Sequence, residues 1–182
     1  MEFEATTLPG VYLITPKVFG DERGFFMESW NADVFANAGF DMHFVQDNHS
    51  RSAKGILRGL HYQTRHTQGK LVRVSAGSVY DVAVDLRRDS PTLGQHYGVT
   101  LDAQSHRMLW IPPGFAHGFY VTSEYADFQY KCTDRYDPDS EISLAWNDPD
   151  IAIAWPVPEG ETPSLSAKDQ QGVPFSDAPL LR

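Results

Sequence analysis

Short runs in which apolar and polar residues alternate follow one another along most of the chain, whereas helical periodicity is weak. Residues 79–86 form the clearest run. Its even-numbered positions carry the larger apolar side chains: Tyr80, Val82, Val84 and Leu86. Asp81, Ala83 and Asp85 occupy the other face, because successive side chains of a strand point to opposite sides. The period of two predicts a β-strand here.

Ten such runs predict ten strands, and glycine and proline residues separate them. The expected strands are residues 10–15, 25–30, 44–48, 56–63, 70–75, 79–86, 97–101, 107–111, 115–122 and 127–133. One short helix is expected between a capping Asn31 and Gly39. Many short strands joined by such turns are typical of a sandwich or barrel, so we expect an all-β fold.

We expect a single domain over residues 1–182, since about 150 residues per domain is usual. The composition changes after about Pro156, where Pro, Ser, Gly and Asp become frequent. Residues 156–182 therefore read as loops with one helical turn near 166–171, packed on the strand domain.

Composition and charge narrow the class of protein. Hydrophobic residues make up 41% and charged residues 21%, which supports a packed core, and the net charge of −9 argues against nucleic-acid binding. No apolar run is long enough to cross a membrane, and the acidic N-terminus lacks the pattern of a signal peptide. Cys132 is the only cysteine, so no intrachain disulfide forms. We expect a cytoplasmic protein.

Ionisable and polar residues occupy strand faces that should be apolar. Lys70 shares a face with Val72 and Val74, His117 lies between two phenylalanines, and Tyr130 alternates with Phe128. Each alone is more often a structural residue than a functional one. Together they favour a site, because burying several charges without a use is costly. Arg58 and His61 have opposite parity and share one cavity only if Gly59 marks a bulge.

The pattern does not favour a metal site. Metal-binding jelly rolls of the cupin type carry a His-x-His pair, then a Glu, and a later Pro-Gly-x-x-His. Residues 113–117 supply the last part, but His61 is followed by Gln63 where the second histidine would stand. Two imidazoles make a poor catalytic metal site, so none is expected. P-loop, nucleophile-elbow and dinucleotide-binding motifs are also missing, which leaves proton transfer by a histidine base, a tyrosine acid and nearby cations.

Six motifs resemble one enzyme family over nearly the whole chain. They are QDNHS (46–50), GILRGLHYQ (55–63), GKLV (69–72), PPGFAHGF (112–119), YK (130–131) and LSAKD (165–169), and they are similar to the dTDP-4-dehydrorhamnose 3,5-epimerases. The resemblance implies a metal-free, cofactor-free jelly roll of the cupin type that forms a homodimer. It also implies epimerisation of dTDP-4-dehydro-6-deoxy-D-glucose at C3 and C5, a step towards dTDP-L-rhamnose.

The same resemblance implies roles for individual residues. His61 would be the base with Asp169 as its partner, Tyr130 the proton donor, and Lys70 the cation at the enolate. Tyr136 would stack on thymine. The residues implied to contact substrate are Arg23, Glu28, Gln46, Asp47, Asn48, Arg58, Lys70, His117, Tyr136, Glu141 and Lys168.

Three alternatives stay open at this stage. One is an epimerase that acts at a single carbon of a related dTDP-4-keto-6-deoxy sugar. Another is a non-catalytic sugar-binding cupin, which the set of His61, Tyr130, Lys70 and Asp169 argues against. The third is a metal-dependent dioxygenase, which Gln63 argues against.

Overall fold

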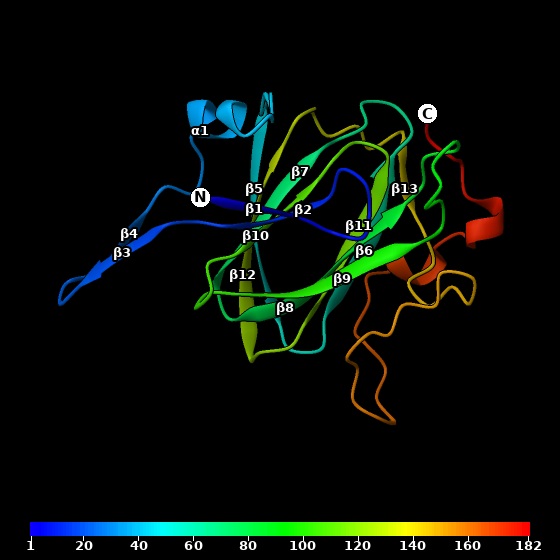
Figure 1. Cartoon of the computed structure of the whole chain (residues 1–182). Coiled ribbons are helices and arrows are strands. Elements are labelled where there is room, and N and C mark those ends of the chain that lie inside the picture. The colour runs from blue at the N-terminus through cyan, green and yellow to red at the C-terminus, as the bar shows by residue number, and fades with distance from the viewer.

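Two antiparallel β-sheets pack face to face and form most of the molecule (Figure 1); the computed structural model describes residues 1–182. In spatial order the first sheet consists of β1 (Glu2–Ala5), β2 (Tyr12–Thr15), β10 (Met108–Ile111), β7 (Lys70–Ala76), β12 (Tyr125–Cys132) and β5 (Gln46–Ala53). The second consists of β13 (Glu141–Ser143), β6 (Leu57–Gln63), β11 (Phe115–Val121), β8 (Ser78–Asp85) and β9 (His96–Asp102). The jelly-roll sandwich confirms the predicted all-β fold.

All ten expected strands are present, and three short ones were not predicted: β1, β3 (Val18–Asp21) and β13. The strand expected at 44–48 is longer than its pattern indicated, because β12 pairs with β5 along the whole of Gln46 to Ala53. The one expected helix is α1 (Ala32–Asn37), and the Asn31 side chain caps it by accepting from the N–H groups of Asp33 and Val34 at 3.1 and 3.2 Å. No helix of the chain is long and apolar enough to cross a membrane.

The space between the sheets holds the main apolar core. Its fully buried members include Val72, Leu109 and Phe128 from the first sheet and Val79 and Val121 from the second. Alternation along the strands directs these side chains inward, as the period of two predicts.

The C-terminal part of the chain covers the outer face of the second sheet. Val82, Val84 and Leu86 pack there against Ile151 and Leu181 in a second buried cluster. Isolated bridges join 56 to 164, 87 to 181 and 144 to 173, and two 3-10 turns lie at 169–171 and 175–177. Strand β8 is therefore buried on both faces, which places Asp81 and Asp85 inside the protein with no exposed surface.

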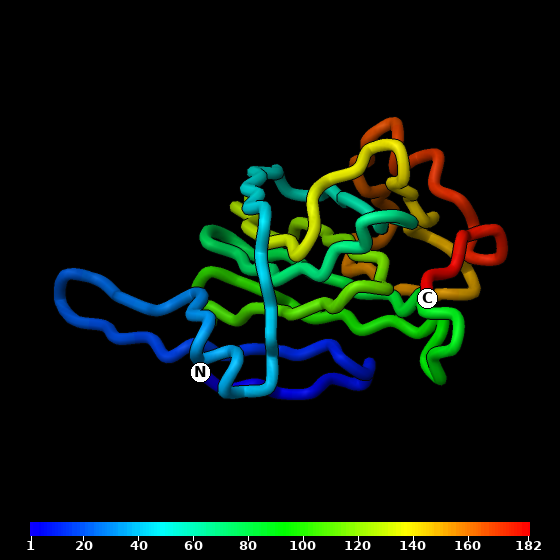
Figure 2. The backbone as a smooth tube through the Cα atoms, turned by 90° about the horizontal axis from the view of Figure 1, so that it is seen from above, coloured from blue at the N-terminus to red at the C-terminus, as the bar shows by residue number.

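The hairpin of β3 and β4 (Gly24–Met27) extends away from both sheets, on the side opposite the C-terminal segment (Figures 1 and 2). Three phenylalanines of this hairpin are exposed: Phe19 by 54%, Phe25 by 62% and Phe26 by 67%. Exposed apolar side chains gathered in this way mark an interaction surface.

Candidate active site

A β-bulge in β6 gives the site its shape. His61 pairs with His117 and Arg58 pairs with Phe119, so three steps along β6 oppose two steps along β11. Gly59 adopts a φ of 107° there, and a Cβ on it would lie 2.6 Å from Gly118 Cα. The structure therefore confirms the bulge that the opposite parity of Arg58 and His61 required. The bulge brings both side chains to one cavity.

That cavity, of about 360 Å³, lies between the two sheets at the end that carries the loop 133–140. Strands β5, β7 and β12 line it from one side and β6 and β11 from the other. Nine of the residues predicted from the sequence line it: Gln46, Asn48, Arg58, His61, Lys70, His117, Tyr130, Tyr136 and Glu141. Most of the predicted site is thus brought together.

His61 and Asp169 form a close pair at the cavity wall. The imidazole Nε2 lies 2.5 Å from Asp169 Oδ1, and Ser166 Oγ donates to the other carboxylate oxygen at 2.8 Å. Burial alone would raise the pKa of Asp169, but the hydrogen bond and charge of His61, together with Ser166, hold it below its ordinary value. An ionised carboxylate only accepts, so Nε2–H of His61 is the donor, and in a neutral imidazole Nδ1 carries the lone pair that a base requires.

Tyr130 and Lys70 enter the cavity from the first sheet, on the neighbouring strands β12 and β7. Burial raises the pKa of the Tyr130 phenol, so this group stays protonated at neutral pH. Burial lowers the pKa of the Lys70 ammonium, and the negative charges of Glu141 and Asp81 offset part of that shift. The site therefore holds one protonated acid and one buried amine opposite the His61 pair.

A second histidine–carboxylate pair lies beside the first. His117 Nε2 is 2.8 Å from Asp81 Oδ1, and Asp81 is completely buried. Its Oδ2 has no hydrogen-bond partner in the structure. Sequence reasoning missed Asp81. Its position between Val79 and Ala83 on the inner face could have indicated a buried partner, because a carboxylate rarely occupies a core position unpaired.

The mouth of the cavity carries a linked polar group. The Tyr136 hydroxyl donates to Glu141 Oε2 at 2.7 Å, and Lys168 forms an ion pair with the same carboxylate. Burial raises the pKa of Glu141, and the bonds from Lys168 and Tyr136 more than offset it, so the net pKa is below its ordinary value. Lys168 is therefore held at the rim by its ion pair with Glu141. On β5, across the cavity, the amide of Gln46 donates to Asn48 Oδ1 at 3.0 Å.

Three of the expected substrate contacts lie away from the cavity. Arg23 and Glu28 lie on and just after the projecting hairpin, where Arg23 binds Asp21 and Glu28 binds Asn31 at 2.8 Å. Asp47 follows Gln46 on β5 and so points to the opposite face of the sheet, where it pairs with Lys131 at 3.0 Å. The chain by itself does not bring these three side chains to the cavity.

The residues at the cavity are poorly suited to holding a metal. His61 and His117 are each engaged with a carboxylate through Nε2, and the amide of Gln63 is bonded to backbone groups of two loops. No group of three or more histidine, cysteine, aspartate or glutamate side chains is arranged to hold a metal ion.

A jelly-roll sandwich with a histidine–carboxylate pair on one side of a cavity, and a phenol and an amine on the other, is suited to proton transfer and is typical of a cupin-type isomerase. A sequence profile described as dTDP-4-dehydrorhamnose 3,5-epimerase matches residues 5–177. The chain belongs to the dTDP-4-dehydrorhamnose 3,5-epimerase family, which confirms the resemblance found in its motifs.

Individual relatives agree with this assignment. The chain is 56% identical to a dTDP-4-dehydrorhamnose 3,5-epimerase of Pseudomonas aeruginosa over 98% of each chain. It is also similar to the crystal structure of a Legionella pneumophila dTDP-6-deoxy-D-glucose-3,5-epimerase in complex with dTDP-4-keto-L-rhamnose, with a TM-score of 0.96, 52% identity and coverage of 100% and 97%. A 3'-monoepimerase from Streptomyces bikiniensis, in complex with dTDP-quinovose, is more distant, with a TM-score of 0.88, 31% identity and coverage of 95% and 87%.

Proposed function

We propose that this protein epimerises dTDP-4-dehydro-6-deoxy-D-glucose at C3 and C5 and so forms dTDP-4-dehydro-L-rhamnose. The observation that carries the proposal is the placement of His61 and Tyr130 on facing sheets, with the cavity between them. Inversion of a carbon requires that a proton leave from one face and return to the other. A sugar ring held between the sheets has a base on one face and an acid on the opposite one.

Each residue then has a chemical role. The C4 ketone acidifies the protons on C3 and C5, because each carbanion is stabilised as an enolate. His61 removes the proton, and Asp169 stabilises the imidazolium that results. The Lys70 ammonium stabilises the developing oxyanion, and Tyr130 returns a proton from the other sheet. The ketone supplies the electron sink, so this mechanism needs no metal and no redox cofactor.

The nucleotide binds at the mouth of the cavity in this proposal. Tyr136 is 51% exposed, and its ring suits stacking on thymine. Arg58 and Lys168 add positive charge near the cavity for the diphosphate, in a chain whose net charge is −9. The other predicted substrate contacts that line the cavity are Gln46, Asn48, His117 and Glu141.

A homodimer would account for the two contacts on the hairpin. The Arg23 side chain is 89% exposed, and the hairpin that carries it extends beyond the sheets with three exposed phenylalanines. A second copy would cover these rings, and each hairpin would bring Arg23 and Glu28 to the cavity of its partner. Mixing His61→Ala with Arg23→Ala protein tests this, because a mixed dimer contains one intact site and should regain activity.

We also infer a single domain and a cytoplasmic location. The C-terminal segment shares a buried cluster with the second sheet, which supports one folding unit over 1–182. Cys132 is a free buried thiol, which suits a reducing compartment.

The test of the proposed reaction is solvent labelling. In heavy water the protein should introduce deuterium at both C3 and C5 of dTDP-4-dehydro-6-deoxy-D-glucose, and a reductase specific for the L-rhamno product should consume NADPH. Label at one carbon only would instead indicate a single-carbon epimerase. Binding without any label would indicate a sugar-binding cupin.

A further inference from the structure

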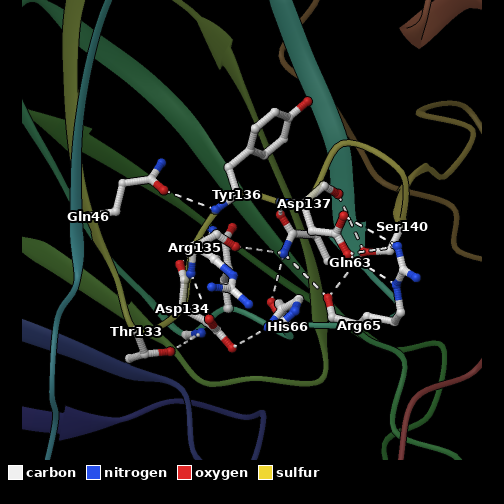
Figure 3. Close-up of polar contacts among 12 residues, drawn as sticks. Gln46, Gln63, Arg65, His66, Thr133, Asp134, Arg135, Tyr136, Asp137 and Ser140 are labelled. Atoms are coloured by element: carbon white, nitrogen blue, oxygen red, sulfur yellow. Dashed lines mark hydrogen bonds and ion pairs between the residues drawn. The ribbon is translucent and has the colours of Figure 1, made fainter.

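The side chain of Gln63 joins two loops at the mouth of the cavity. It stands at the end of β6 and is only 4% exposed. Its Nε2 donates to the carbonyl oxygens of His66 at 2.7 Å and Arg135 at 3.2 Å, with Arg65 O at 3.4 Å, and its Oε1 accepts from Asp137 N–H at 3.0 Å. Figure 3 shows these bonds converging on one buried amide.

The bonded groups of the second loop lie on either side of Tyr136. Gln63 holds the carbonyl before this residue and the N–H after it, while Gln46 Oε1 accepts from the N–H of Tyr136 itself at 3.0 Å. The ring points away from the Gln63 cluster (Figure 3) and is half exposed. The hydroxyl at the tip of the ring donates to Glu141 Oε2 at 2.7 Å, and the backbone bonds of the turn fix the other end, where the side chain leaves the chain.

Other contacts of the same turn are weaker restraints. Arg65 and Asp137 form an ion pair at 3.2 Å, but the arginine side chain is 64% exposed. His66 and Asp134 lie 3.3 Å apart with both side chains exposed by more than a third. Exposed pairs of this kind contribute little, whereas an unmet hydrogen bond in a buried site is costly.

We propose that Gln63 is a positioning residue for nucleotide recognition: its amide fixes the turn 135–137 and thereby the ring of Tyr136. The inference rests on the proposed stacking of Tyr136 on thymine. The amide is suited to the task because it offers two N–H donors and an acceptor on one short group. Leucine has neither, and glutamate would set carboxylate oxygens against backbone carbonyls.

The experiment measures dTDP affinity by calorimetry on the full chain, alongside steady-state kinetics. We expect Gln63→Leu to weaken dTDP binding about five- to hundredfold, the range expected when a base–aromatic stack is lost. KM should rise while kcat stays within about threefold, because the loss is in binding. Arg65→Gln is the matched control, since it removes only the exposed bond to the same turn, and it should change affinity by less than about twofold.

A double variant separates positioning from general damage. If Gln63 acts through Tyr136, Gln63→Leu should cost no further affinity in a Tyr136→Ala background, whereas independent effects would add. Additive losses, or an unchanged affinity in folded Gln63→Leu, would overturn the role of Gln63 alone. An unchanged affinity in Tyr136→Ala would overturn the stacking itself. If Gln63→Leu does not fold, Gln63→Met keeps the unbranched shape without the amide or a charge, and the same outcomes apply.

Discussion

Replacing Asp169 with asparagine removes one negative charge from the site and puts an amide donor where the second oxygen accepts from Ser166. The two side chains have the same shape, and asparagine Oδ1 still accepts a hydrogen bond from Nε2–H of His61. Asp169 is only 3% exposed, so solvent screens this charge little. Compared with Ser166→Ala, which removes the bond to the second oxygen alone, the change measures the electrostatic support that the carboxylate gives to the imidazolium in the proposed mechanism.

The magnitude follows from the geometry. The contact is 2.5 Å between Nε2 and Oδ1. The centres of the two charged groups are then about 4 Å apart, where an effective dielectric constant near 20 gives about 4 kcal/mol. Part of this is retained by the neutral hydrogen bond, so we expect kcat to fall about 100- to 1000-fold.

Deuterium wash-in at C3 under saturating substrate is the assay, because it reports proton abstraction directly. Ser166→Ala is the graded control, since it removes only the 2.8 Å bond to the second oxygen and should slow exchange by about tenfold or less. His61→Ala should abolish exchange, and adding Asp169→Asn to it should make no further difference. Exchange by Asp169→Asn within about tenfold of the wild-type rate would refute the reasoning.

Three other predictions concern the proposed proton donor Tyr130, the buried carboxylate of Asp85, and activity after metal chelation. Tyr130→Phe should retain deuterium wash-in but form little L-rhamno product, and equal loss of both would show that the phenol is not simply the acid. The pKa of Asp85 is lowered to about 2: burial raises it, and Arg87, Ser90 and Thr92 more than offset this. Its stabilisation, about 2 kcal/mol, should be present above about pH 4 and lost as the pH falls towards 2, so urea unfolding of Asp85→Asn and wild type should converge there. Activity should survive exhaustive chelation, and a metal required to restore turnover would contradict the proposed mechanism.

The strands and their inner faces were predictable because the period of two is a local property. It placed Lys70, His117 and Tyr130 on faces that the structure turns inward. It also required a bulge at Gly59, since without one Arg58 and His61 would point to opposite sides.

Contacts between distant segments were not predictable from the pattern. Asp169 lies 108 residues from His61, in a 3-10 turn of a segment without strand or helix periodicity, so only the family resemblance indicated the pair. The pattern gave Gln63 no role beyond the absence of a metal ligand, because its partners are backbone groups of loops that carry no periodicity. The pattern also did not indicate that the β3–β4 hairpin extends beyond the two sheets, which is seen only in the folded chain.

The cavity uses burial in two ways that serve one reaction. Removal from water raises the pKa of Tyr130, which keeps a proton available on one sheet, and lowers the pKa of Lys70. The lowered pKa means that the charged form of Lys70 is less stable before substrate binds. In the proposed mechanism an enolate develops beside Lys70 and acts against this effect, because an adjacent negative charge favours the protonated form. In that mechanism the charged form of Lys70 is stabilised most when the oxyanion is present, which is the differential interaction that lowers a barrier.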